Sequence, residues 1–443
     1  MGLLDMPSEL LLLIGENLSI KDIYHLLSTC GLLSSVLTPV LEKLGVQDVG
    51  DQSALQWAAE RGHASLARLA ILRGAQIDEP NESRDTQTPR RTVARRSHPD
   101  DIYEIELSMT IDAISIQSWN PLHLAAQHNH PDVVRILVSH GARIDARDGN
   151  SRTPLHMATK YNNHDVIATL AELGATIDAR DKYYRTPLHW ATKYNYRRVT
   201  RILVSQGATI DAIDQNSRTP LHLAAKYGNL DIIRYLVAHG ATIDSRDEDS
   251  LTPLHLAAED ANADNVRFFV IHGAAIDAGD RYSRTPLYLA AGSGDPDTIR
   301  YFISHGATIH PLNAQGNAPA HRAASEWRVA CMEAFIEAGF PLDTRGCCGQ
   351  TVFHNAAIGN IDVLMYLLRQ TGAEKVINLQ DRYGSTPLHM SAATRNVVQL
   401  LLHGADPELK DNKGRKPALS GYDMRKFEEA RRALRTEGSE ASI

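Results

Sequence analysis

The sequence predicts an all-α solenoid of stacked helix pairs with short β-turn fingers, preceded by a small three-helix domain. Three observations predict it: a four-residue signature that recurs every 33 residues, a glycine that follows each second apolar stretch, and a leucine-rich N-terminal segment that lacks both markers. Of the 443 residues, 43% are hydrophobic and 22% are charged, which is ordinary for a folded protein.

The signature has the form Thr-Pro-Leu-His. Its clearest copies begin at Thr153, Thr186, Thr219, Thr252 and Thr386, of which the first four are 33 residues apart. Weaker copies begin at Ser53, Asn120, Thr285, Ala318 and Thr351, and a degenerate one at Lys416. Threonine is a favoured helix N-cap, and proline suits the first helical position because its missing N–H would have no partner there. Each copy therefore predicts the start of a helix.

A glycine closes each unit, since glycine readily adopts the left-handed conformation that ends a helix. These glycines are Gly74, Gly141, Gly174, Gly207, Gly240, Gly273, Gly306, Gly339, Gly372 and Gly404. Between the two markers, stretches such as 221–225 and 232–237 predict two short antiparallel helices. Two short helices cannot bury both of their apolar faces alone, so neighbouring units have to stack.

This 33-residue pattern resembles the ankyrin repeat, and the resemblance extends from residue 51 to about residue 420 with one interruption. It implies a curved solenoid in which the fingers and the first helices line a concave binding face. The sequence thus predicts a first repeat at 51–78, a flexible basic insertion at 79–118, a repeat array at 119–420, and a capping helix with a polar tail at 421–443.

Two of these segments carry further expectations. The insertion contains an arginine-rich run at 90–96, which is interpreted as a solvated surface segment or, alternatively, as a nuclear-import signal. In the capping helix, Met424, Phe427 and Leu434 are expected to face inward.

The repeats depart from the ankyrin pattern in two ways. The finger glycine is present as Gly316, Gly349 and Gly384, but five units have another residue there: Ser151, Tyr184, Ser217, Ser250 and Ser283. A side chain at this position predicts a strained turn or a different turn type. The unit that begins at Thr386 also reaches its glycine three residues early, which predicts a shortened loop between its helices.

Residues 1–45 resemble the F-box. The resemblance rests on the Met6-Pro7 opening with Glu9, on the apolar run 10–14, and on the Asp22-Ile23 pair ahead of Cys30. Methionine and isoleucine stand where the family has leucines, and the aromatic residue expected after the cysteine is absent. Five consecutive apolar residues cover more than half of a helix, whereas packing against one core uses only a stripe, so part of this surface needs a partner.

The F-box resemblance implies docking on a Skp-family adaptor of a cullin-RING ubiquitin ligase. By position, it assigns adaptor contact to Met6, Pro7, Glu9, Leu10, Ile14, Leu18 and Ile23. The alternative is that the segment only caps the first repeat, because every solenoid end needs a cover.

Cargo is expected on the finger tips and the exposed ends of the first helices. The same residue types recur there at steps of 33 and form a basic and aromatic strip, predicted as the cargo site: Arg152, Lys160, Tyr161, Arg185, Lys193, Tyr194, Arg218, Lys226, Tyr227, Tyr282 and Arg284. Such a strip suits an acidic or phosphorylated protein segment. The alternative is that these types are ordinary for ankyrin repeats and that cargo binds another surface.

The sequence does not predict an enzyme, a cofactor or a metal site. It contains no phosphate loop, nucleophile elbow, dinucleotide fingerprint or zinc-protease helix. Eight of the 20 histidines occupy the signature, where they are expected to bond to the backbone between repeats, and five more precede the closing glycines. The four cysteines are interpreted as reduced thiols because neither their number nor their spacing predicts disulfides or zinc.

The sequence therefore predicts a non-enzymatic substrate-recognition subunit of a cullin-RING ligase, located in the cytoplasm or nucleus. The alternative is an ankyrin scaffold or transcriptional regulator with no ligase association. With a net charge of -7 and no long apolar run near the N-terminus, neither nucleic acid nor a membrane is the expected partner.

Overall fold

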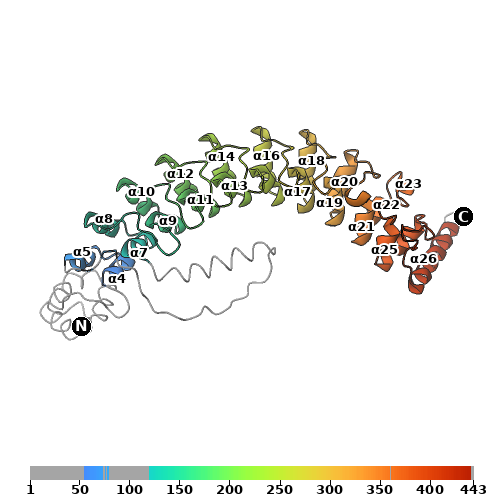
Figure 1. The fold of residues 1–443 in the computed structure, drawn as a ribbon, viewed down its shortest axis with the longest axis horizontal. Coiled ribbons are helices and arrows are strands. Elements are labelled where there is room, and N and C mark those ends of the chain that lie inside the picture. The colour runs from blue at the N-terminus through green and yellow to red at the C-terminus, as the bar shows by residue number, and fades with distance from the viewer. Residues whose placement is uncertain (1–53, 73–74, 76, 79–118, 360, 441–443) are drawn as a thin grey trace, which may run out of the picture. The chain divides into compact units, whose positions relative to one another are not determined.

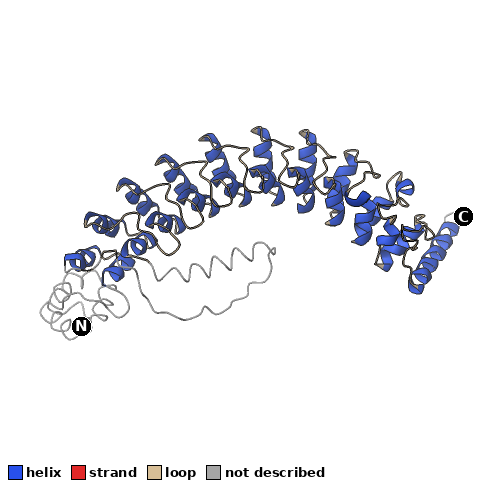
Figure 2. Cartoon of the chain, in the orientation of Figure 1, coloured by secondary structure: helices blue, strands red, loops and turns tan. Residues whose placement is uncertain are grey.

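The computed structural model describes residues 54–72, 75, 77–78, 119–359 and 361–440. The F-box-like segment 1–45 and the insertion 79–118 lie outside the described residues, so the expectations for them stay predictions. All regular structure within the described residues is helical, without a strand (Figure 2). The chain divides between Pro220 and Leu221 into two compact units.

The described part of the first unit is built from four helix pairs, which are labelled in Figure 1. Its helices are α4 (Ala54–Arg61), α5 (Ala64–Leu72), α7 (Pro121–Gln127), α8 (Pro131–Ser139), α9 (Pro154–Lys160), α10 (His164–Glu172), α11 (Pro187–Lys193) and α12 (Arg197–Ser205). The first helices of the pairs, α4, α7, α9 and α11, pack in one layer, and the second helices, α5, α8, α10 and α12, pack in another. The stacking of short pairs is as predicted.

The second unit repeats this arrangement. Its helices are α13 (Pro220–Lys226, which starts at the boundary), α14 (Leu230–Ala238), α15 (Pro253–Glu259), α16 (Ala263–Ile271), α17 (Pro286–Ser293), α18 (Pro296–Ser304), α19 (Pro319–Ser325), α20 (Val329–Glu337), the 3-10 turn η3 (Cys347–Gly349), α21 (Val352–Ile358), α22 (Ile361–Leu368), α23 (Ala373–Val376), α24 (Pro387–Met390), α25 (Thr394–Leu402) and α26 (Gly421–Glu440). Here α15, α17, α19, α21 and α24 form one layer, and α14, α16, α18, α20, α22 and α25 form the other.

The core of each unit lies between its two layers. The signature leucines Leu122, Leu155 and Leu188 are fully buried in the first unit, as are Leu254 and Leu287 in the second. Each second helix adds apolar residues to the same space, among them the fully buried Phe269, Phe302 and Phe335. Burial of a side chain of this size stabilises a fold by about 1.5–3 kcal/mol.

Where a repeat carries the signature histidine, that residue joins it to the next repeat. In α11, Nδ1 of His189 accepts the Thr186 N–H at 3.1 Å, and Nε2 lies 3.0 Å from the carbonyl oxygen of Arg218 in the following finger. A backbone N–H can only donate, so the ring is in its neutral form with the proton on Nε2. The same bond to a backbone carbonyl is made by His123, His156, His189, His222, His255, His321, His354 and His389. The predicted role of these histidines is confirmed.

The fingers are also joined, by one backbone hydrogen bond between neighbours. In the first unit, the N–H of Lys182 donates to the carbonyl of Asn150 at 2.8 Å, and the N–H of Gln215 to that of Tyr183 at 3.0 Å. Within most fingers an aspartate caps the turn. Oδ1 of Asp148, for example, accepts the N–H groups of the second and fourth residues that follow it, at 2.8 and 2.9 Å.

Of the two predicted outcomes for the non-glycine finger residues, the structure shows the strained turn rather than a different turn type. Ser151, Tyr184, Ser217, Ser250 and Ser283 have φ values between 55° and 60°, in the left-handed region. Gly316, Gly349 and Gly384 have positive φ at the equivalent positions. The turn therefore keeps its type, and the side chain is tolerated at a cost of roughly 1–2 kcal/mol per residue.

The unit that begins at Thr386 differs from the expected structure. The unit of Thr386 shortens its first helix, α24, to four residues, while the connection to α25 keeps three residues, 391–393. The predicted shortened loop is therefore wrong, because the three missing residues come from the helix.

The C-terminal helix α26 packs against α25, as expected of a capping helix. However, Met424 is 37% exposed, and the inward residue of its first turn is Asp423, which accepts the Ser420 N–H at 2.9 Å. Phe427 is half-buried, and the side chain of Leu434 is not described.

We expect Ser217→Gly and Ser250→Gly to raise the free energy of unfolding by about 1 kcal/mol each, because glycine has no Cβ to strain the left-handed backbone. Urea titration followed by circular dichroism measures the change. Ser217→Ala is the matched control, since alanine keeps the Cβ and should give no increase. Equal effects of glycine and alanine would contradict the strain argument.

We also expect acid to destabilise the repeats. Burial lowers the pKa of His123, His156, His189, His255, His321 and His354, that of His156 to about 4. The unfolded chain binds protons near pH 6.5, whereas the folded chain does not, so stability is complete above pH 6.5 and falls as the pH decreases toward 4. For His156 the difference between 6.5 and about 4 corresponds to roughly 3 kcal/mol.

Urea midpoints at pH 7.5, 6.0 and 5.0 test this expectation. Replacing a joining histidine, as in His189→Gln, should lower the midpoint at pH 7.5 and flatten its pH dependence. Replacing the exposed His140 at the end of α8 by glutamine should change neither. A midpoint that is constant between pH 7.5 and 5.0 would rule out the titration of the buried rings.

Candidate protein-binding site

The predicted lysines and tyrosines lie together at the ends of first helices. Lys160 and Lys193 are the last residues of α9 and α11, and Tyr161 and Tyr194 are the C-cap residues that follow. A cation is favoured at this end because the helix dipole places partial negative charge there. Tyr161 is 41% exposed and Tyr194 39% exposed, so both rings are accessible.

A cluster of aromatic rings and cations surrounds Trp190 in the first unit. The Lys160 ammonium lies 5.9 Å from the centroid of the Trp190 ring, and the Tyr194 ring lies 6.0 Å from it. Tyr194 stacks in turn on Tyr196, at 5.8 Å between centroids. Cation–π contacts at exposed sites contribute about 0.5–1 kcal/mol each. Trp190 itself is buried, so the accessible part of the cluster consists of the exposed Tyr194 ring with the partly exposed Tyr196 and Lys160.

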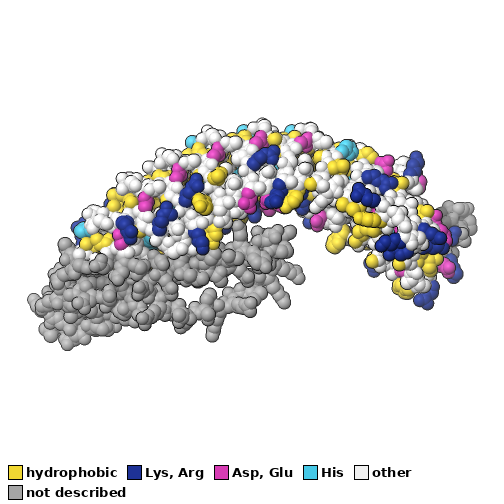
Figure 3. Space-filling model, in the orientation of Figure 1, with side chains coloured by type: hydrophobic (Ala, Val, Ile, Leu, Met, Phe, Trp, Pro, Cys, Tyr) yellow, Lys and Arg dark blue, Asp and Glu magenta, His cyan; other side chains and the backbone are white. Residues whose placement is uncertain are grey.

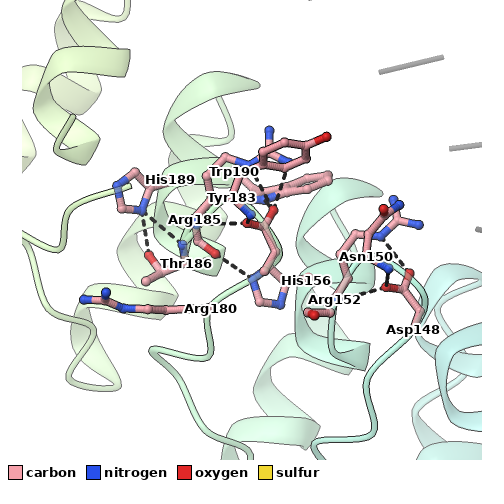
Figure 4. Close-up of polar contacts among 12 residues, drawn as sticks. Asp148, Asn150, Arg152, His156, Arg180, Tyr183, Arg185, Thr186, His189 and Trp190 are labelled. Carbon is pink, nitrogen blue, oxygen red and sulfur yellow. Dashed lines mark hydrogen bonds and ion pairs between the residues drawn. The ribbon is translucent and has the colours of Figure 1, made fainter. Parts of the chain in front are cut away.

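Sequence reasoning missed Trp190 and Tyr196. Trp190 lies in the first helix, at a position where most other repeats have leucine or methionine. In the structure its Nε1 donates to Oδ2 of Asp181, at 3.2 Å, which turns the indole toward the finger (Figure 4). The signal in the sequence was the exchange of an aliphatic residue for tryptophan.

The arginines of the strip form ion pairs within their own fingers. Nε of Arg152 lies 2.7 Å from Oδ2 of Asp148, and the Arg152 side chain is only 2% exposed (Figure 4). This burial and the ion pair give Arg152 a structural role in its finger, and its contact with cargo stays a prediction. The equivalent arginines Arg185, Arg218 and Arg284 pair with Asp181, Asp214 and Asp280, respectively, and are 18–27% exposed.

Arg185 additionally contacts two rings. Its guanidinium carbon lies 4.9 Å from the ring centroid of Tyr183 and 4.7 Å from that of Trp190. Because the same guanidinium contacts both rings and its Nε donates to Asp181 at 2.9 Å, Arg185 helps to position the rings of the cluster.

The second unit contains the remaining strip residues. Lys226 ends α13, and Tyr227 after it is 40% exposed. In the next repeat the equivalent positions are acidic, Glu259 and Asp260. Tyr282 is 44% exposed on its finger, where the guanidinium carbons of Arg281 and Arg284 each lie 5.1 Å from its ring centroid. The lysine and tyrosine pattern thus ends within this unit, and Tyr282 forms a separate aromatic and cationic group.

Two of the thiols are held in their protonated form. Burial raises the pKa of Cys331 to about 11, and the hydrogen bond with Cys348 raises the pKa of Cys347. The histidines before the closing glycines bond through Nδ1 to the carbonyl four residues earlier, as His239 does to Tyr235 at 2.8 Å.

The described part of the chain holds no group of three or more histidine, cysteine, aspartate or glutamate residues arranged to bind a metal ion. Within that same part, none of the helices combines the length and the apolar character that crossing a membrane requires. On the visible side of the repeats, hydrophobic and charged side chains are interspersed (Figure 3).

Comparisons with known proteins place the chain in a family. The family described as "Ankyrin repeats (3 copies)" matches residues 24–148, 101–181, 149–214, 177–247, 244–313 and 320–411. No curated protein sequence matches the chain. Among solved structures, the human ASB11 ankyrin repeat domain is 25% identical, with 50% of this chain and 99% of that chain covered and a TM-score of 0.46. Because the family matches cover most of the sequence, this chain belongs to the ankyrin-repeat proteins, which are generally non-enzymatic scaffolds for protein–protein interaction.

Proposed function

We propose that this protein is the substrate-recognition subunit of a cullin-RING ubiquitin ligase. Residues 1–45 dock a Skp-family adaptor, and the ankyrin repeats bind the cargo. The observation that carries the proposal is the F-box-like pattern of the first 45 residues directly ahead of a protein-binding array. A segment of this length is near the lower limit for independent folding, which favours a function in contact with another protein.

Adaptor docking accounts for residues that a simple cap leaves unexplained. A cap needs apolar residues facing the first repeat, which the leucines of 10–14 supply. It does not need the Met6-Pro7 opening with Glu9, or the Asp22-Ile23 pair.

We expect Leu10→Ala combined with Ile14→Ala to abolish co-precipitation of the Skp-family adaptor. Truncation of a central apolar anchor costs about 2 kcal/mol or more, roughly thirtyfold in affinity per residue. Circular dichroism should show unchanged helicity. If the doubly substituted protein retains normal adaptor binding, the ligase role is wrong and a scaffold or transcriptional regulator without ligase association takes its place.

Cargo binding is proposed for the lysine and tyrosine positions: Lys160, Tyr161, Lys193, Tyr194, Lys226 and Tyr227. Of the predicted strip, these are the residues at exposed helix ends rather than within the fingers. Ammonium groups beside exposed aromatic rings favour a partner that offers carboxylates or phosphates on an extended segment. The proposed cargo is therefore an acidic or phosphorylated protein segment.

We expect the triple reversal Lys160→Glu, Lys193→Glu and Lys226→Glu to reduce cargo recovery at least about tenfold, because it replaces attraction by repulsion. Affinity purification with quantitative mass spectrometry measures the recovery. Reversal of Arg425, Arg431 and Arg432 on α26 changes the net charge equally and should leave recovery intact. Adaptor binding should survive both triple variants, and unchanged cargo in the lysine variant would assign cargo to another surface.

A further inference from the structure

Trp327 occupies a backbone position that disfavours large side chains. It follows the C-cap residue of α19 and has φ of 60°, in the left-handed region. The equivalent residues of other repeats are Asn129, Asn162, Asn195, Gly228, Ala261 and Gly294. Asparagine and glycine are the types that tolerate this conformation, whereas a bulky side chain there is a genuine outlier. The strain at Trp327 therefore calls for an explanation outside the local backbone.

Core packing does not provide that explanation, because the Trp327 side chain is 56% exposed. One edge of its indole lies over Gly359 of the next repeat, where an added Cβ would overlap the indole nitrogen. Next to Gly359, Ile358 is 57% exposed at the end of α21. Earlier repeats have lysine at the position of Ile358, as at Lys160. Trp327 and Ile358 thus expose apolar surface next to the end of a first helix, the place where Lys226 lies earlier in the same unit.

Two guanidinium groups come from the same repeat as Trp327 and reach toward the preceding repeat. Arg322 lies over the ring of Tyr288, 5.4 Å from its centroid, and Arg328, the residue after Trp327 in the chain, donates from Nε to the carbonyl of Gly292 at 3.2 Å. A side chain at Gly292 would collide with Arg322, so this glycine leaves the space that the arginine fills. Within the described residues, neither arginine pairs with a carboxylate. The repeat that exposes the indole therefore also carries two cations without an acidic partner in the described part of the chain.

We propose that Trp327, Ile358, Arg322 and Arg328 form a docking surface, the Trp327 surface, for a peptide segment that presents a large apolar side chain beside carboxylates. Exposed tryptophans and arginines are the residue types that dominate binding energy in protein interfaces. Strained backbone tends to persist where a function requires it. The proposal uses the protein-binding character of the family and depends neither on the adaptor nor on the lysine and tyrosine positions.

The test is a selection of displayed random dodecapeptides on the full-length protein, followed by affinity measurements on the enriched peptides. We expect peptides with an aromatic or leucine residue next to aspartate or glutamate. Trp327→Asn introduces the residue of Asn129, Asn162 and Asn195, so it should weaken these peptides at least about tenfold while the urea midpoint stays the same or rises. The triple lysine reversal should leave their affinity unchanged, which separates this surface from the proposed cargo site.

Ile358→Lys is the second variant, because it restores the residue type of earlier repeats and leaves Trp327 in place. Loss of peptide affinity in Ile358→Lys at an unchanged urea midpoint supports the proposal even if Trp327→Asn proves less stable. The proposal is overturned if no such peptides are enriched, or if the enriched peptides bind both variants as tightly as the unsubstituted protein.

Discussion

The bond from the signature histidine to the next finger is the interaction on which the array depends. It requires a neutral imidazole, because Nδ1 accepts from the threonine N–H while Nε2 donates to the carbonyl, as at His156 and Arg185. That state is maintained by burial, because removing the ring from water disfavours its charged form. The same ring thus caps its own helix and fixes the distance to the following repeat, which explains why threonine, proline, leucine and histidine recur as one block.

One repeat of the second unit lacks this joint. Tyr288 stands at the histidine position, and its N–H bonds to the Thr285 hydroxyl, at 3.2 Å. The space beside the tyrosine ring is covered from the next repeat by Arg322, whose guanidinium lies over the ring. Here a tyrosine replaces the histidine: its side chain hydrogen-bonds with that of Asn313 in the next finger, and the arginine covers its ring. The repeat that supplies this arginine is also the one that carries Trp327, so a change in how two repeats are joined coincides with a change in the chemistry of the exposed surface.

The sequence predicted those features that repeat and missed those that depend on neighbours. Helix starts, closing glycines and the histidine bonds follow from local rules that apply to every unit. The role of Arg152 depends on Asp148 four residues earlier and on Trp119 from the preceding repeat, whose indole donates to the same carboxylate at 3.1 Å. Positive φ at Trp327 could not be read from the residue itself, since tryptophan disfavours that conformation; only alignment with Asn162 and Asn195 would have revealed it. For the unit of Thr386, the sequence showed that three residues are missing relative to the other repeats, but the prediction placed the gap in the loop rather than in α24.

The backbone of the repeats is constant, whereas the side chains at its exposed positions differ from repeat to repeat. The fingers keep their left-handed residue even where it is serine or tyrosine, because the aspartate of the turn and the bond to the next finger determine the backbone. The ends of the first helices are similarly determined, so the side chains there can change from lysine at Lys160 to glutamate at Glu259 and isoleucine at Ile358 without altering the path of the chain. Residues on such a frame lose little conformational freedom when a partner binds. Differences between repeats at one structural position therefore act mainly on the choice of partner, and the repeat that departs furthest from the pattern at a strained position is the one where recognition is most strongly indicated.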